Sequence, residues 1–314
     1  MFITISLNII FLALGFFLLA KGADVFVDGS SSIAKRFKIP QIVIGLTVVA
    51  MGTSMPEAAV SIKAAISGNA DISIGNVVGS NILNILIILG LSALIFPLSM
   101  KKSTQAIDIP IVIGASALLF VLGLTGVIAW WGGLIFLLAF AGYLAFLFIS
   151  SKNSPDSDSD EIKDMPVWKS IIFIILGIGM IIFGSECAVT TASTLAKLAG
   201  LNDAFIGLTV VALGTSLPEL FTSVAAAMKK NSDIAIGNII GSNIFNILFI
   251  LGITSLITPI NFAPSFLIDT AISLGCAALV LVLSLWGRKI NRFGGAIMLA
   301  CYGGYFAYLL TQTI

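Results

Sequence analysis

The sequence predicts an all-α polytopic membrane protein with ten transmembrane helices in two inverted five-helix repeats. Three observations predict this fold: long apolar runs recur along the chain, its two halves are copies of each other, and basic loops alternate between the copies. Hydrophobic residues make up 58% of the 314 residues and charged residues 10%, against about 45–50% and about 25% in globular proteins. So small a fraction of charged residues excludes a chain made of two soluble domains.

Each apolar run has about 20 residues or more, the length that a helix needs to cross the hydrocarbon core. The first run lacks a basic region before it and a clear cleavage site, so we expect a first span and not a signal peptide. No charge marks the division between the fourth and fifth spans near Gly126. The ten expected spans are residues 4–32, 39–66, 72–97, 106–124, 128–150, 168–196, 204–228, 234–258, 266–286 and 293–312.

The two halves match at a constant offset of 162 residues. "GLTVVAMGTSMPE" (45–57) agrees with "GLTVVALGTSLPE" (207–219) at 11 of 13 positions, and "DISIGNVVGSNILNILIILG" (71–90) resembles "DIAIGNIIGSNIFNILFILG" (233–252). Chance similarity between apolar helices does not produce a gapless repeat of this length. We therefore divide the chain into a first half (1–150), a polar cytoplasmic linker (151–166) and a second half (167–314).

An odd number of spans in each half means that the second copy enters the membrane from the opposite side. Basic loops test this, because Lys and Arg prefer cytoplasmic loops. The two copies have four pairs of equivalent loops. In each pair, the loop of one copy carries more Lys and Arg, and the loop of the other copy carries few or none. We therefore expect a multi-pass protein of the inner (plasma) membrane with both termini outside. The 13 of 16 basic residues that fall on the cytoplasmic side are Lys35, Arg36, Lys38, Lys101, Lys102, Lys152, Lys163, Lys169, Lys229, Lys230, Arg288, Lys289 and Arg292.

Two glutamates, Glu57 and Glu219, lie in the middle of apolar runs, each directly after a proline. An ionised carboxylate at this depth costs about 2.5–3.5 kcal/mol on insertion scales, and no Lys or Arg lies at matching depth in either span. Protons or a bound cation must balance the charge. Pro56 and Pro218 cannot donate to the preceding turn, so we expect a bend that frees main-chain carbonyls near Ala50–Gly52 and Ala212–Gly214.

Other oxygen-bearing side chains surround these glutamates in both copies. Thr53 and Glu57 share a helix face at a spacing of four, and the next span adds a polar stripe at the same spacing. Asn76 and Asn238 begin this stripe in the two copies. Hydrogen bonding between helices explains these two residues as well as ion binding does. The remaining members of the set are Ser54, Ser80, Asn84, Thr215, Ser216, Ser242 and Asn246.

Carboxylate, hydroxyl, amide and carbonyl oxygens form a site for a hard cation. Ca²⁺ accepts six to eight such oxygens in flexible geometry, and two carboxylates neutralise one Ca²⁺ or two Na⁺. Zn²⁺ and Cu⁺ would need His or Cys, but the chain has no His and its three cysteines lie far apart. The alternative is a pair of protonated, hydrogen-bonded glutamates that only hold helices together.

The paired "GTSMPE" and "GTSLPE", each followed by "GN(V/I)(V/I)GSNI(L/F)N", resemble the alpha repeats of sodium/calcium exchangers of the calcium/cation antiporter superfamily. The resemblance covers essentially the whole chain and is closest to compact prokaryotic members, because the linker is too short for a regulatory calcium-binding domain. It implies exchange of Ca²⁺ for Na⁺ by alternating access, with spans 1 and 6 sliding past a core of spans 2, 3, 7 and 8.

The resemblance also implies a role for each residue. Glu57 and Glu219 would be the central ligands, and Thr53 and Thr215 would complete the calcium site. Some relatives carry Asp where this chain has Asn246. The asparagine removes a possible third carboxylate from the site and argues against potassium coupling. Flanking sodium sites and a further amide ligand would come from Ser54, Ser80, Ser216, Ser242, the carbonyls of Ala50 and Ala212, and Asn84.

Other functions remain open at this stage. A Ca²⁺/H⁺ antiporter is the nearest alternative, although such proteins carry an acid in "GNxxE" where this chain has Gly79 and Gly241. A cation channel would not need two inverted copies of one buried site. We expect no enzymatic activity, no cofactor, no nucleic-acid partner and no obligate protein partner, so the chain would be a monomer in the lipid bilayer. Asp24 and Glu186 are intramembrane acids of undecided role.

Overall fold

The computed structural model describes residues 2–153, 164–200 and 212–313, and these residues are overwhelmingly helical. In the first half the helices are α1 (Phe2–Phe37), α2 (Gln41–Ile44), α3 (Ala50–Thr53), α4 (Met55–Ile66), α5 (Ile72–Leu83), α6 (Gly90–Ile95), α7 (Ile109–Gly123) and α8 (Trp130–Asn153). Three π-helical turns connect or precede them: η1 (Gly45–Val49), η2 (Asn84–Leu89) and η3 (Thr104–Asp108).

The second half repeats this order among its described residues, except that no π-helical turn precedes α15. Its helices are α9 (Val167–Leu198), α11 (Ala212–Thr215), α12 (Leu217–Met228), α13 (Ser232–Ile244), α14 (Leu251–Ile257), α15 (Pro264–Ser284) and α16 (Arg292–Thr313), with the π-helical turn η5 (Phe245–Ile250) between α13 and α14.

Eight continuous helical segments in the described residues are long and apolar enough to cross a membrane, and α2–α3 with α4 form a ninth, bent by 50°. The expected seventh span covers residues 204–228. The part 204–211 lies outside the described residues, and α11 and α12 form the remaining part. The expected boundary near Gly126 is confirmed: α7 ends at Gly123, and Gly126 turns the chain with φ +77°.

Two short β pairs, which the sequence did not predict, join the halves. β1 (Leu98–Ser99) pairs with β4 (Lys289–Ile290), and β2 (Val127–Ile128) pairs with β3 (Ile260–Asn261), both antiparallel. Adding the offset of 162 to the residue numbers of β1 gives those of β3, and adding it to those of β2 gives those of β4. One pair is therefore the symmetry image of the other. This symmetry is a property of the folded chain and not only of its sequence.

The segments α5–η2–α6 and α13–η5–α14 form the centre of the molecule. In their apolar windows 72% and 94% of the residues are buried, against 17–44% for the other continuous spans. The polar stripes of both copies therefore lie inside the protein, where their amides and hydroxyls need partners.

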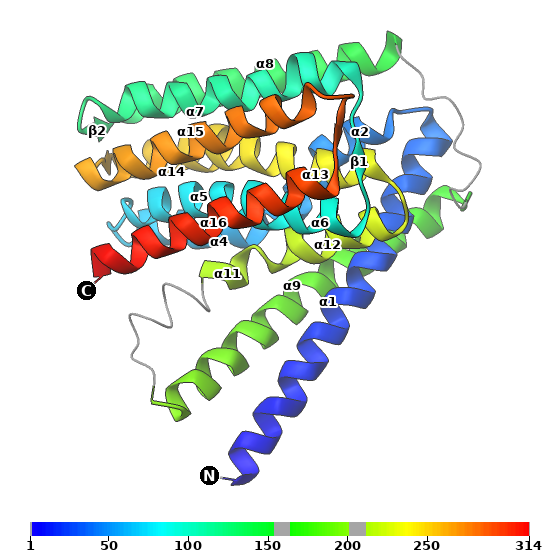
Figure 1. Ribbon diagram of the computed structural model, residues 1–314, viewed down its shortest axis with the longest axis horizontal. Coiled ribbons are helices and arrows are strands. Elements are labelled where there is room, and N and C mark those ends of the chain that lie inside the picture. Colours follow the sequence, from blue (N-terminus) through cyan, green and yellow to red (C-terminus); the bar gives the residue numbers. More distant parts are fainter. Residues whose placement is uncertain (1, 154–163, 201–211, 314) are drawn as a thin grey trace.

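α1 and α9 lie side by side and cross the stack of the other helices obliquely (Figure 1). Glycines allow this close antiparallel packing: a Cβ on Gly22 would come within 3.0 Å of Gly177 O, and one on Gly184 within 2.9 Å of Gly15 O. Small residues that let backbones approach are typical of helix contacts in membranes.

Candidate cation-binding site

Both glutamates lie at a helix break. α3 ends at Thr53, Ser54 leaves helical geometry (φ −83°, ψ 9°), and α4 begins at Met55 with Pro56 in its first turn. The second copy repeats the break at Ser216 (φ −90°, ψ 4°). Proline is tolerated in a first turn, where its missing N–H costs nothing. The break puts each glutamate in the first turn of a helix, where the positive end of the helix dipole favours a carboxylate.

Glu57 and Glu219 are completely buried, with 0% exposure. Each is bound by a serine of the opposite copy: Ser54 Oγ donates to Glu219 Oε1 at 2.6 Å, and Ser216 Oγ lies 3.3 Å from Glu57 Oε1. The two carboxylates therefore belong to one site at the contact between the repeats.

The serines of the next span close the site from the other side. Ser80 Oγ lies 3.3 Å from Ser216 Oγ, and Ser242 Oγ lies 3.4 Å from both Glu219 Oε1 and the carbonyl of Ala50. This brings the expected sodium ligands of four helices together. The carbonyl of Ala50 also accepts from Ser54 N at 3.0 Å and from Thr53 Oγ1 at 3.2 Å, so the bend does not free this carbonyl as expected.

Asn76 and Asn238 hold helices together. Asn238 Nδ2 donates to Ser223 Oγ at 2.8 Å and to the carbonyl of Glu219 at 3.3 Å, and its Oδ1 accepts from Thr53 Oγ1 at 2.9 Å. Asn76 makes the equivalent bonds to Ser61 Oγ and the carbonyl of Glu57. Of the two explanations for these asparagines, the observed contacts favour hydrogen bonding between helices.

Four buried oxygens of the predicted ligands have no hydrogen-bond donor. They are the second carboxylate oxygens of the two glutamates and the amide oxygens of two asparagines: Glu57 Oε2, Glu219 Oε2, Asn84 Oδ1 and Asn246 Oδ1. A buried acceptor without a donor costs about 1–3 kcal/mol. Four acceptors in matching positions of the two copies are the arrangement that a cation would satisfy.

No basic side chain compensates the two carboxylates within the described part of the chain. The ion pairs found there involve Arg36, Lys101 and Lys229 with aspartates, and neither glutamate takes part. No group of three or more His, Cys, Asp or Glu occurs in that part either. The site therefore combines at most two charges with neutral oxygens, as Ca²⁺ or Na⁺ sites do.

Two predicted residues of the second copy lie in the short helix α11. Thr215 ends α11 directly before the break, and Ala212 is the first described residue of that helix. The segment 201–211, which includes most of the second "GLTVVA" motif, lies outside the described residues.

The intramembrane acids of undecided role lie apart from this cluster. Lys229 Nζ contacts Asp28 Oδ1 at 2.7 Å and Asp24 Oδ1 at 3.4 Å, which ties α1 to the end of α12, and Glu186 is exposed. The sequence did not single out Asp28. Asp24 is thus part of an ion pair between helices and does not line the cation site.

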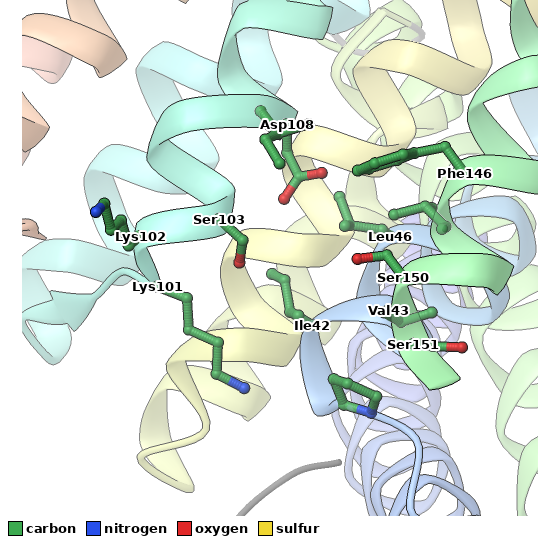
Figure 2. A pocket seen from close by; sticks show the side chains of 13 residues that line it. Ile42, Val43, Leu46, Lys101, Lys102, Ser103, Asp108, Phe146, Ser150 and Ser151 are labelled. Atoms are coloured by element: carbon green, nitrogen blue, oxygen red, sulfur yellow. The ribbon is translucent and has the colours of Figure 1, made fainter. Parts of the chain in front are cut away.

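A separate cavity of about 400 Å³ opens between the start of α2, the η3 turn and the end of α8. Figure 2 shows Asp108, Ser103 and Ser150 around it, with Phe146 on the α8 side. None of the predicted ligands lines this cavity, which separates it from the glutamate site.

Comparison with known proteins identifies the family. A family model described as sodium/calcium exchanger protein matches residues 7–149 and 169–311. The chain belongs to the sodium/calcium exchanger family. Among its relatives in that family is the sodium/calcium exchanger MaX1 of Methanosarcina acetivorans, 33% identical, which aligns over 97% of this chain and 99% of its own length.

Two further proteins are similar to this chain over almost its whole length. The putative antiporter CaxA of Alkalimonas amylolytica is 38% identical over 96% of this chain and 98% of its own. The structure of the sodium-calcium exchanger NCX_Mj soaked with zero Na⁺ and Ca²⁺ matches with a TM-score of 0.86 at 36% identity, over 97% of this chain and 99% of that one. The expected membership of a family of compact exchangers is therefore confirmed.

Proposed function

We propose that this exchanger carries Ca²⁺ in one direction and Na⁺ in the other by alternating access. The observation that carries the proposal is the set of four buried oxygens without a donor among the predicted ligands: two belong to glutamates that meet at the contact between the repeats, and two are neutral amide oxygens. Two negative charges balance one Ca²⁺ or two Na⁺, so both cargoes leave the site neutral. Membership of the sodium/calcium exchanger family supports the same cargoes.

The architecture of the proposal is ten spans in two inverted repeats, 1–150 and 167–314, joined by a cytoplasmic linker at 151–166. Inverted repeats place a substrate site near the midplane, and an exchange of conformations between the repeats opens it to one side or the other. We place the protein in the inner membrane as a monomer. The distribution of basic residues supports an orientation with both termini outside.

The ligands of the proposal are the twelve predicted residues. Glu57, Glu219, Thr53 and Thr215 form the calcium site, with Asn84 and Asn246 supplying amide oxygens, and the serines and carbonyls serve sodium. The contacts of Ser54, Ser80, Ser216, Ser242 and Ala50 with one another and with the glutamates support this set.

The test is ⁴⁵Ca²⁺ uptake into proteoliposomes with imposed gradients. An outward-directed Na⁺ gradient should drive uptake, and added K⁺ should not be required, because Asn246 stands where potassium-dependent relatives carry an acid. Uptake that follows a pH gradient and ignores Na⁺ would assign the protein to the Ca²⁺/H⁺ antiporters, and uptake without any counter-gradient dependence would assign it to the channels.

A further inference from the structure

Two asparagines beside the site, Asn81 and Asn243, are not among the predicted ligands. They lie near the ends of α5 and α13, three residues before Asn84 and Asn246, and the offset of 162 converts one into the other. Both are buried, with 1% and 0% exposure. A buried amide has two donors and an acceptor to satisfy, so its bonds specify which way it points.

The two asparagines bind each other across the repeats. Asn81 Nδ2 donates to the backbone carbonyl of Asn243 at 3.2 Å, and Asn243 Nδ2 donates to the backbone carbonyl of Asn81 at 3.3 Å. A backbone carbonyl only accepts, so it specifies which end of each side-chain amide faces it. The Oδ1 of each must then point the other way.

Those Oδ1 atoms accept from the two predicted amide ligands. Asn84 Nδ2 donates to Asn243 Oδ1 at 3.0 Å, and Asn246 Nδ2 donates to Asn81 Oδ1 at 3.1 Å. With their nitrogens held in this way, Asn84 and Asn246 keep Oδ1 without a donor. If either ligand amide flipped, it would set two oxygens against each other and present an NH₂ group to the cation.

We propose that Asn81 and Asn243 are positioning residues that hold the amide oxygens of Asn246 and Asn84, respectively, toward the transported cation. The inference rests on the proposed function, because it takes these oxygens as ligands. Each ligand amide is oriented by the opposite repeat. The pairing is specific: Asn81 acts through Asn246, and its side chain makes no bond to the side chain of Asn84.

A double-mutant cycle tests the specific pairing. Asn81→Leu removes the acceptor at similar volume, and Asn246→Ala removes the ligand. The readout is Ca²⁺ affinity of purified, monodisperse protein, measured by ⁴⁵Ca²⁺ binding. We expect each single variant to bind Ca²⁺ roughly tenfold more weakly, the size of one contact to a charged group. The double variant should bind no more weakly than Asn246→Ala, because the Asn81 side chain bonds the ligand amide of Asn246 and not that of Asn84.

The matched control combines Asn81→Leu with Asn84→Ala. Here the two losses should multiply, to roughly a hundredfold, since the two positions belong to different amide pairs. A merely structural role for Asn81 would multiply with both ligand variants alike, and that result would overturn the proposal. So would an Asn81→Leu variant of unchanged affinity.

The outcomes for this inference and for the ion site are distinguishable. If Asn246→Ala alone leaves Ca²⁺ affinity unchanged, Asn246 is not a ligand, and the proposed site fails together with the inference. If it weakens binding while Asn81→Leu does not, only the inference fails. The mirror set, Asn243→Leu with Asn84→Ala and with Asn246→Ala as control, gives the same test where Asn81→Leu does not yield monodisperse protein.

Discussion

Each buried glutamate is held by a serine from the other copy of the repeat. Ser54 and Ser216 sit at the helix breaks, so they are free of regular helix geometry and reach across to Glu219 and Glu57. A serine can satisfy one carboxylate oxygen and leave the second for an ion. The second oxygen of each glutamate therefore has no donor and is available to the proposed cation.

At the same scale we predict the effect of removing one charge. Glu57→Gln keeps the shape but leaves Ca²⁺ with one carboxylate where it needs two. The loss should be about 3–4 kcal/mol, or roughly 100- to 1000-fold in affinity, the size expected when one partner of a buried ion pair is removed. Glu219→Gln should behave alike, and ⁴⁵Ca²⁺ binding to purified protein measures both.

The control for this prediction is Asp71→Asn, an exposed acid at the start of α5. Its removal should leave Ca²⁺ affinity unchanged, because exposed charges are screened. Near wild-type affinity in either glutamine variant would show that the glutamate concerned is not a central ligand.

Prolines and glycines determine the shape of the helices and how closely they pack. Prolines lie at the breaks between α3 and α4 and between α11 and α12, beside the candidate site, and glycines let α1 and α9 pack closely. A Cβ on Gly177 would lie 2.7 Å from backbone N of Phe26, whereas one on Gly179 of the same helix would meet no neighbour within 4 Å in the described residues. These two glycines provide a matched pair with the same intrinsic gain in helix propensity.

We predict that Gly177→Ala forces α1 and α9 apart and destabilises the protein by about 1–3 kcal/mol, the usual cost of overpacking. The thermal unfolding temperature in detergent should fall by several degrees, and Na⁺-driven Ca²⁺ uptake should slow. Gly179→Ala should leave both unchanged or slightly raise the unfolding temperature. Equal behaviour of the two variants would mean that the close contact between α1 and α9 is not needed for stability or exchange.

For the whole molecule, pseudo-symmetry is the governing property. The β1–β4 and β2–β3 pairs, the crossed serine–glutamate bonds and the reciprocal Asn81–Asn243 bonds all follow the same offset. With five expected spans in each half, we expect the two halves to enter the membrane from opposite sides.

Site-directed labelling checks this orientation. In a background lacking Cys187, Cys276 and Cys301, single cysteines at the exposed positions Arg36 and Lys230 should react with an impermeant reagent only from the cytoplasm. Cysteines at Asn69 and Lys197 should react only from outside, because their loops are poor in basic residues. Labelling of positions 36 and 197 from the same side would contradict the inverted repeat.

The sequence by itself determined the membrane class, the repeat and the family, and it predicted the chemistry of the site. These follow from composition, from the offset of 162 and from residue types such as Glu57 beside Pro56, all of which are local or periodic and need no knowledge of packing. The helix break at Ser54 was expected within about two residues for the same reason, since proline acts on its own turn.

Only the tertiary structure decided which groups meet. That Ser54 serves Glu219 and not its own neighbour Glu57, and that Asp24 pairs with Lys229, depend on contacts between residues more than 100 positions apart. That Asn76 and Asn238 hold helices depends on their bonds to the preceding helix of the same repeat. The β pairs and the amide pairs of Asn81 and Asn243 escaped prediction for the same physical reason. A repeat specifies that two positions are equivalent, whereas their partners are set by how closely packed helices bring oxygens and nitrogens together.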